Sequence, residues 1–170
     1  HTHLSPEELE KLETLQLKGR YTKYQKTLDA FLFCCYAGMR YSDFVNMKPD
    51  NIVEMHQETW LIYKSIKTGT EVRLPLYLLF SGKGILILNK YQANLQDFFH
   101  LRDNSNVNKE LIIIARLAGV AKKVSFHTAR HTNATLLIYN GVNITTVQKL
   151  LGHKSVKTTQ IYTNVMDATI

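Results

Sequence analysis

The residues most able to do chemistry lie near the end of the chain, in the segment LLGHKSVKTTQIYT from Leu150 to Thr163. This segment places His153 nine positions before Tyr162, and the link between them is basic and rich in threonine. A tyrosine hydroxyl is a weak nucleophile at neutral pH because its reference pKa is about 10. It becomes effective where cations and hydrogen bonds stabilise the developing charge. The segment therefore predicts that cationic side chains from elsewhere in the chain lie beside Tyr162.

Three cationic motifs precede this segment. His127 and Arg130 are three positions apart at a predicted helix start, so they share one helical face beside the positive end of the helix. Arg40 follows a predicted buried helix and stands three residues before Asp43. Lys67 lies in the sequence KTG, a predicted turn between two strands. Together these side chains could bind an anion.

Each motif also has an ordinary structural interpretation. His127 can cap a core, an arginine at such a place can pair with an acid such as Asp43, and a lysine in a hairpin is normally solvated. A zinc site is a further alternative, because His127 and His131 have a ligand spacing and His153 follows. No cysteine or acid near these histidines in the sequence completes a ligand set, which argues against zinc. Hydrolase triad motifs and a glycine-rich phosphate loop are absent from the sequence.

Charge is distributed unevenly along the chain. The 170 residues carry a net charge of +7. Residues 1–17 hold four acids against one base, whereas residues 104–166 hold eight bases against one acid. A basic segment of that size indicates a polyanionic partner such as nucleic acid, and a merely soluble basic surface is the alternative.

The composition is that of a folded globular domain. Hydrophobic residues make up 45% of the chain, which is long enough to bury a substantial core. Cys34 and Cys35 are adjacent in an apolar run, so we expect reduced core thiols and a cytosolic protein. No signal peptide is visible, and no apolar run approaches the ~18 residues that a membrane span needs.

The elements that must position these residues are predicted to be mostly helical. Ser5-Pro6-Glu7-Glu8 combines a capping serine, a first-turn proline and a glutamate three residues after the cap, which predicts a helix start. Three short runs rich in β-branched and aromatic residues, 51–55, 59–65 and 70–74, predict a three-stranded antiparallel sheet. Further helices are expected at 21–37, 39–47, 77–80, 85–91, 108–118, 128–140 and 144–151, with a loop around 98–106 and a last helix or turn that begins at Ser155 or Lys157 and carries Tyr162. The fold class is thus α+β, mostly α-helical with one small three-stranded antiparallel sheet.

The order of the cationic motifs and the tyrosine along the chain is also informative. Arg40, Lys67, His127-x-x-Arg130, His153 and Tyr162 resemble the catalytic set of the tyrosine recombinases, the phage integrase family. GMRYSDF resembles the first arginine motif of that family and SIKTGTEVRLPL its lysine hairpin, while HTARHTNATLLIYNGVNITTVQKLLGHKSVKTTQIYTNV is similar to the second motif through to the nucleophile. The resemblance covers nearly the whole chain, is strongest to integrases of bacterial mobile elements, and implies the tyrosine recombinase catalytic-domain fold. FFHL at residues 98–101 departs from the pattern, because relatives often have a proline there.

The resemblance implies a role for each catalytic residue. Tyr162 would attack a scissile DNA phosphate, forming a 3′-phosphotyrosyl bond and releasing a 5′-hydroxyl. Arg40 and Arg130 would hold the nonbridging oxygens, Lys67 would protonate the leaving 5′ oxygen, and His127 would be the acid–base partner of the tyrosine. This set would work without metal, cofactor or ATP.

The resemblance extends to supporting residues and to partners. His153 would hydrogen-bond the phosphate, Asp43 would be a supporting acid and His131 a packing residue, while Lys123 and Lys154 would contact DNA. The implied partners are double-stranded DNA and further copies in a tetramer, in the bacterial cytoplasm and at the nucleoid when acting. We interpret residues 1–170 as one catalytic domain, without the N-terminal DNA-clamping domain of the family. Two alternatives stay open: a type IB topoisomerase, and a non-catalytic DNA-binding regulator on the same scaffold.

Overall fold

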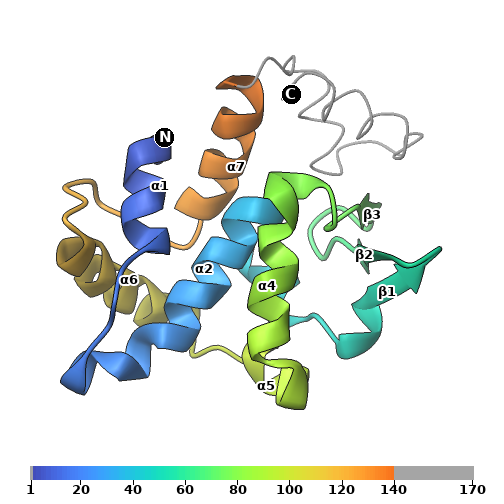
Figure 1. Cartoon of the computed structure of the whole chain (residues 1–170), viewed down its shortest axis with the longest axis horizontal. Helices are drawn as coiled ribbons and strands as arrows, with labels where there is room; N and C mark the ends of the chain where they lie inside the picture. The colour runs from blue at the N-terminus through green and yellow to red at the C-terminus, as the bar shows by residue number, and fades with distance from the viewer. Residues whose placement is uncertain (1, 140–170) are drawn as a thin grey trace.

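Helices make up most of residues 2–139, the part of the chain that the computed structural model describes (Figure 1). The described α-helices are α1 (Pro6–Glu13), α2 (Gln25–Ala37), α3 (Tyr41–Val45), α4 (Lys83–Lys90), α5 (Leu95–Phe99), α6 (Asn104–Ala118) and α7 (Thr128–Tyr139). Short 3-10 helices connect them: η1 (Gly19–Tyr24), η2 (Pro49–Asn51), η3 (Leu79–Gly82) and η4 (Gln92–Asn94). The predicted helices at 144–151 and around Tyr162 lie outside the described residues.

One antiparallel sheet lies at the side of the helices (Figure 1). Its strands are β1 (Ile52–Met55), β2 (Glu58–Lys64) and β3 (Glu71–Leu74), in the order β1-β2-β3. Tyr63 stands opposite Val72, and this register brings the two strands together at a turn of residues 65–70. The predicted three-stranded sheet and the α+β fold class are therefore confirmed.

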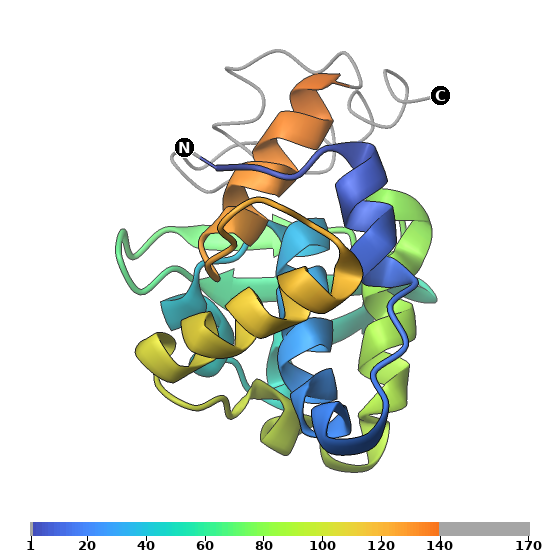
Figure 2. The same cartoon turned by 90° about the vertical axis from the view of Figure 1, so that its left-hand side faces the viewer.

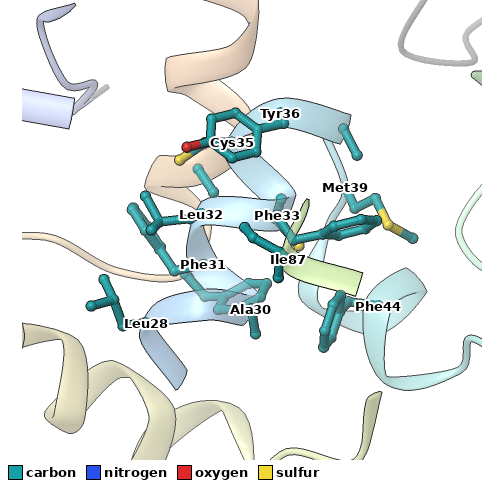
Figure 3. Close-up of a cluster of buried hydrophobic side chains, with 14 of the residues drawn as sticks. Leu28, Ala30, Phe31, Leu32, Phe33, Cys35, Tyr36, Met39, Phe44 and Ile87 are labelled. Carbon is teal, nitrogen blue, oxygen red and sulfur yellow. The ribbon is translucent and has the colours of Figure 1, made fainter. Parts of the chain in front are cut away.

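Helix α2 forms the centre of the core. It is apolar on all sides from Ala30 onward and is buried along nearly its whole length, with α4, α6 and α7 packed around it (Figure 2). Its side chains interlock with Met39, Phe44 and Ile87 from neighbouring segments (Figure 3). The helix ends as predicted at Gly38, whose φ of 69° is the left-handed conformation that glycine adopts most easily.

The ends of α1 and α2 follow from local chemistry. The predicted helix start at Ser5 is confirmed: Ser5 and Glu8 form a reciprocal capping box with bonds of 2.9 and 3.2 Å. Helix α2 begins at Gln25 and not at Tyr21, because the four residues before it continue the 3-10 helix η1. Cys34 and Cys35 are free and buried in the core, and burial raises the pKa of both thiols.

The prediction of a loop around residues 98–106 was wrong. The expected loop around 98–106 contains the end of α5 and the start of α6, which begins at Asn104 and not at Asn108. Two caps explain the difference, since Asn94 accepts from the Asp97 N–H and Asp103 accepts from the Asn106 N–H. Phe98 and Phe99 are fully buried, so core packing stabilises a five-residue helix that has no periodic signal of its own.

None of the helices within residues 2–139 is both long enough and apolar enough to cross a bilayer.

Candidate active site

The loop before α7 presents His127 at the protein surface. The Ser125 N–H donates to Thr128 Oγ1 at 3.0 Å, and the Phe126 N–H donates to Asn108 Oδ1 at 2.8 Å. Phe126 is buried and packs edge-on against Tyr41. These contacts fix the start of α7, so exposed His127 and buried Arg130 project from a rigid helix end.

Arg130 is a buried cation held against the end of α2. Its residue is 6% exposed, and its Nη1 donates to the Gly38 carbonyl oxygen at 2.7 Å. Burial and the nearby charge of Arg40 lower the pKa of Arg130 to about 10, a value at which it is still protonated at neutral pH. The cation is therefore kept in a partly desolvated place, where its field acts more strongly than it would in water.

Arg40 lies two residues beyond Gly38, at the start of α3. Its side chain is 16% exposed, and its Nη1 lies 3.9 Å from Asp43 Oδ2. The structural alternative for Arg40, pairing with Asp43, is thus present in the molecule. The distance of 3.9 Å from Arg40 Nη1 to Asp43 Oδ2 is longer than a hydrogen bond, so Arg40 can still donate to a second anion.

Asp43 connects this arginine to the β2–β3 hairpin. Its side chain is fully buried, and Oδ1 accepts from the Ile66 N–H at 2.8 Å. Among the described residues, its Oδ2 has no hydrogen-bond partner. A buried carboxylate with one free oxygen is costly unless cations offset its charge, and Arg40 is beside it. Asp43 therefore joins the first arginine motif to the lysine hairpin.

Lys67 lies at the tip of that hairpin and is exposed. The turn is closed by Ser65, whose N–H donates to the Thr70 carbonyl and whose own carbonyl accepts from the Gly69 N–H, both at 2.8 Å. Gly69 has a φ of 70°, a conformation that the turn requires and glycine tolerates. The hairpin thus holds the lysine in solvent close to the buried Asp43.

The charges that act on His127 come from the other predicted site residues. Its pKa is lowered by partial burial first, and then by the charges of Arg130, Arg40 and Lys67. These residues come from three separate segments of the sequence and act on one imidazole. His127 is therefore mainly neutral at pH 7 and able to accept a proton.

His131 lies against His127, with ring centroids 4.5 Å apart and the rings nearly perpendicular. The interpretation of His131 as a packing residue stays a prediction. Within residues 2–139, no group of three or more histidine, cysteine, aspartate or glutamate side chains is placed to hold a metal ion.

Sequence reasoning missed two buried polar residues beside the arginines. Asn133 is 3% exposed, and its Nδ2 donates to the Cys35 and Tyr36 carbonyls at 2.9 and 3.3 Å. Tyr63 is buried on β2, and its pKa is raised by burial and by Asp43. An asparagine inside the apolar run NATLLI was a usable signal for the first. Nothing in the sequence distinguished Tyr63 from other strand residues.

The remaining predicted site residues are placed as follows. Lys123 is exposed in the loop before α7. His153, Lys154 and Tyr162 lie outside the described residues, so the structure neither joins them to the site nor separates them from it.

Comparisons with known proteins identify the family. Residues 3–169 match the phage integrase family. Among curated proteins, the chain is 50% identical over 145 residues to "Tyrosine recombinase XerD" of Listeria monocytogenes, covering 75% of this chain and 46% of that protein. It is 34% identical over 150 residues to "Tyrosine recombinase" of Thermosipho africanus, covering 84% of this chain and 50% of that protein. The chain thus spans about half the length of these curated relatives.

Solved structures give the same result for the fold. The XerA recombinase superposes with a TM-score of 0.69 at 26% identity, over 96% of this chain and 60% of that chain. A lambda integrase dimer bound to a core site superposes with a TM-score of 0.65 at 20% identity, over 91% of this chain and 58% of that chain. Together with the motifs and the geometry above, these matches show that the chain belongs to the phage integrase family of tyrosine recombinases.

Proposed function

We propose that this chain is the catalytic domain of a site-specific DNA recombinase, which cleaves and rejoins DNA strands through a 3′-phosphotyrosyl intermediate. The observation that carries the proposal is the joint placement of two arginines and a lysine hairpin. Arg130 is pinned to Gly38, Arg40 follows two residues later, and Asp43 ties Arg40 to the hairpin of Lys67. A cationic site of this kind suits the nonbridging oxygens of a phosphodiester.

The chemistry needs a nucleophile held in line with the leaving oxygen, and it needs neutralisation of the charge on the phosphate. Tyr162 Oη attacks the phosphorus, and its proton passes to neutral His127. The bond from phosphorus to the 5′ oxygen breaks, and Lys67 donates a proton to that oxygen. Arg40 and Arg130 stabilise the charge that develops on the nonbridging oxygens.

His153 completes the set by hydrogen-bonding the phosphate in this proposal. The phosphotyrosyl bond conserves the energy of the broken phosphodiester, so a 5′-hydroxyl can attack it and rejoin the strand without ATP. All protons in the scheme are carried by side chains of this chain. No metal and no cofactor is part of the proposed reaction.

The proposed partners are double-stranded DNA and further copies of the protein. Related structures include a lambda integrase tetramer bound to a Holliday junction and the XerH recombinase bound to its difH substrate. By analogy, we infer that this chain acts as a tetramer on DNA and that Lys123 and Lys154 contact the DNA backbone. We also propose that the whole protein has an N-terminal DNA-clamping domain. We further propose that it acts at the bacterial nucleoid and that it serves a mobile element.

Covalent trapping tests the function. A nicked suicide duplex incubated with the full-length protein should yield an adduct that survives denaturation, and Tyr162→Phe should abolish it. Tyr139→Phe is the matched control, because Tyr139 is the 74%-exposed tyrosine at the end of α7. An undiminished adduct with Tyr162→Phe would refute the assignment of the nucleophile.

The same material separates the two alternatives. A recombinase joins strands from two differently labelled duplexes, whereas a type IB topoisomerase relaxes one supercoiled duplex without exchanging partners. A non-catalytic regulator gives no adduct with any substrate. The six predicted catalytic positions are all occupied by residues that can do the chemistry, which argues against the non-catalytic regulator.

A further inference from the structure

Tyr41 and Phe126 are the chain neighbours of two proposed catalytic residues. Tyr41 directly follows Arg40, and Phe126 directly precedes His127. The two rings meet edge to face, with centroids 5.6 Å apart and an angle of 86° between the ring planes. Such a contact is a favoured aromatic geometry. It connects the first arginine motif to the start of α7, although these segments lie far apart in the sequence.

Phe126 holds its side of this contact firmly. It is fully buried, and its ring also packs against Phe31 of α2 and Phe44 of α3, with centroids 6.4 and 6.1 Å away. Its N–H donates to Asn108 Oδ1 at 2.8 Å, which fixes its backbone against α6. Because closely packed rings have little room to move, the backbone of the next residue, His127, is held at a defined place.

Tyr41 holds the other side of the contact. It is half-buried, and its hydroxyl donates to the Arg102 carbonyl oxygen at 2.6 Å. Arg102 directly precedes Asp103, the residue that caps the start of α6. The tyrosine is thus held by its hydroxyl at the start of α6 and by its ring at Phe126.

Helix α6 closes a frame around the two aromatic residues. Tyr41 is bonded to the residue before the cap of α6, and Phe126 is bonded to Asn108 in the second turn of the same helix. The ring contact joins Tyr41 to Phe126 directly. Neither residue can shift without breaking a contact to α6 or to the other ring, so the frame fixes the start of α3 relative to the start of α7.

The field at His127 depends on this relative position. The cations that act on His127 in the described part of the chain are Arg130, Arg40 and Lys67, and the His131 ring lies against it. Arg130 and His131 belong to α7 and move with His127. Arg40 and Lys67 come from other segments, so their distances from His127 are set by tertiary contacts.

We propose that Tyr41 is a positioning residue, which sets the distance between Arg40 and His127 through its contact with Phe126. This inference rests on the proposed function for the roles of Arg40 and His127. Misplacing reacting groups by about 1 Å can lower a rate by up to ~10²-fold, so a residue outside the reaction can control it. Ordinary core packing is the competing explanation, in which Tyr41 stabilises the fold and leaves the two catalytic residues unaffected.

The pKa of His127 measures the positioning without any DNA. The full-length protein with isotope-labelled histidine is titrated and followed by NMR, and the signal of His127 is identified by its loss in His127→Asn. Tyr41→Leu removes the ring contact and frees Arg40 to move away. An imidazole with fewer cations beside it binds a proton more readily, so the pKa of His127 should rise in this variant. Phe126→Leu removes the same contact from the other side and should also raise it.

Tyr41→Phe is the conservative variant. It keeps the ring at Phe126 and loses the bond to the Arg102 carbonyl, so it should leave the pKa of His127 unchanged and keep most of the cleavage rate.

Single-turnover cleavage of the nicked suicide duplex is the second measurement. Tyr41→Leu should lower the rate by up to about 10²-fold, and the acid limb of its pH profile should move to higher pH together with the pKa of His127. Because Tyr41 and Phe126 act through the same contact, the variant that combines Tyr41→Leu with Phe126→Leu should be little slower than the slower single variant.

Tyr77→Leu is the matched control. Tyr77 is also half-buried and also contacts an aromatic ring, that of Trp60 at 6.1 Å, but neither of its chain neighbours is a proposed site residue. This variant should change neither the pKa of His127 nor the rate. All rates are compared at equal folded fraction, measured by denaturant unfolding.

Two results would overturn the proposal. One is an unchanged pKa of His127 in both Tyr41→Leu and Phe126→Leu. The other is an equal loss of rate at every pH with an unmoved acid limb, which is the result that core packing alone predicts. Failure of the proposed function looks different, because the wild-type protein then cleaves no duplex while the pKa of His127 still reports its distance from Arg40.

Discussion

The Asp43 carboxylate accepts a hydrogen bond of 2.8 Å from the Ile66 N–H, and this bond joins the segment of Arg40 to the hairpin of Lys67. The two residues are 23 positions apart in the sequence. The other carboxylate oxygen faces Arg40 at 3.9 Å. One buried acid thus links the segments of two cations that the proposed mechanism uses at different oxygens of the same phosphate.

Substitution of Asp43 should separate these two functions. Asp43→Asn keeps an acceptor for the Ile66 N–H but removes the charge opposite Arg40, whereas Asp43→Ala removes both. Because a buried donor left unsatisfied costs about 1–3 kcal/mol, Asp43→Ala should be the less stable variant in denaturant unfolding. It should also slow adduct formation more than Asp43→Asn. Equal rates in the two variants would show that the bond to Ile66 does not position the hairpin.

Arg130 should contribute more to the reaction rate than to DNA affinity. It is one cation among many that can bind the DNA backbone, but it is held in a buried place beside Arg40. Loss of a preorganised charge at the reacting centre typically lowers the rate ~10²–10³-fold. Arg130→Ala should therefore reduce single-turnover cleavage far more than it weakens binding. Equal losses in rate and affinity would indicate an ordinary phosphate contact.

Lys67 should act as the general acid. A 5′-phosphorothiolate substrate places sulfur at the leaving position, and sulfur leaves with little need for a proton. Lys67→Ala should be severely slowed on the ordinary substrate and nearly normal on the sulfur substrate. Lys64→Ala, which changes an exposed lysine at the end of β2, is the control. Without rescue by sulfur, His127 becomes the leading candidate for the acid.

The activity should depend on neutral His127. Burial and three nearby cations lower its pKa below the ordinary value of 6.5. The proton-accepting form then predominates at pH 6.5 and above, and it is lost as pH falls through the lowered pKa. Cleavage at subsaturating DNA should show an acid limb below pH 6.5, and His127→Asn should remove that limb together with most of the rate.

The same shift has a consequence for stability. Because His127 binds a proton less readily in the folded state than in the unfolded state, the unfolded state holds more protons below about pH 6.5. Folding stability should therefore fall as pH drops through this window, and His127→Asn should reduce that dependence. Chemical unfolding at several pH values measures it.

Asn133 should position the second arginine motif. Its amide donates to the Cys35 and Tyr36 carbonyls near the end of α2, and Arg130 donates to the Gly38 carbonyl. These bonds fix the position of α7 relative to the segment that leads to Arg40. Asn133→Leu should reduce stability by about 1–3 kcal/mol and slow cleavage. Thr132→Val is the matched control, because Thr132 is a buried neighbour that bonds to Leu4 and Thr128 instead. If both variants slow cleavage equally at equal folded fraction, Asn133 has only a structural role.

The sequence by itself determined the elements whose signals are local. The capping box at Ser5, the glycine stop at Gly38 and the period-two strands all depend on neighbours within a few residues, and each appears where it was predicted. The order of the motifs also identified the family, because residue types at matching positions are a property of the chain alone. Local signals failed at α5, where Phe98 and Phe99 gain their helical conformation from burial in the core.

Tertiary structure alone decided how the cations are arranged. The bond from Arg130 to Gly38 spans 92 positions, and those from Asn133 to α2 span 97 and 98. No short-range pattern encodes such contacts, since they arise from packing α7 across the end of α2. The lowered pKa values of His127 and Arg130 follow from the same packing, because burial and neighbouring charge exist only once distant segments meet.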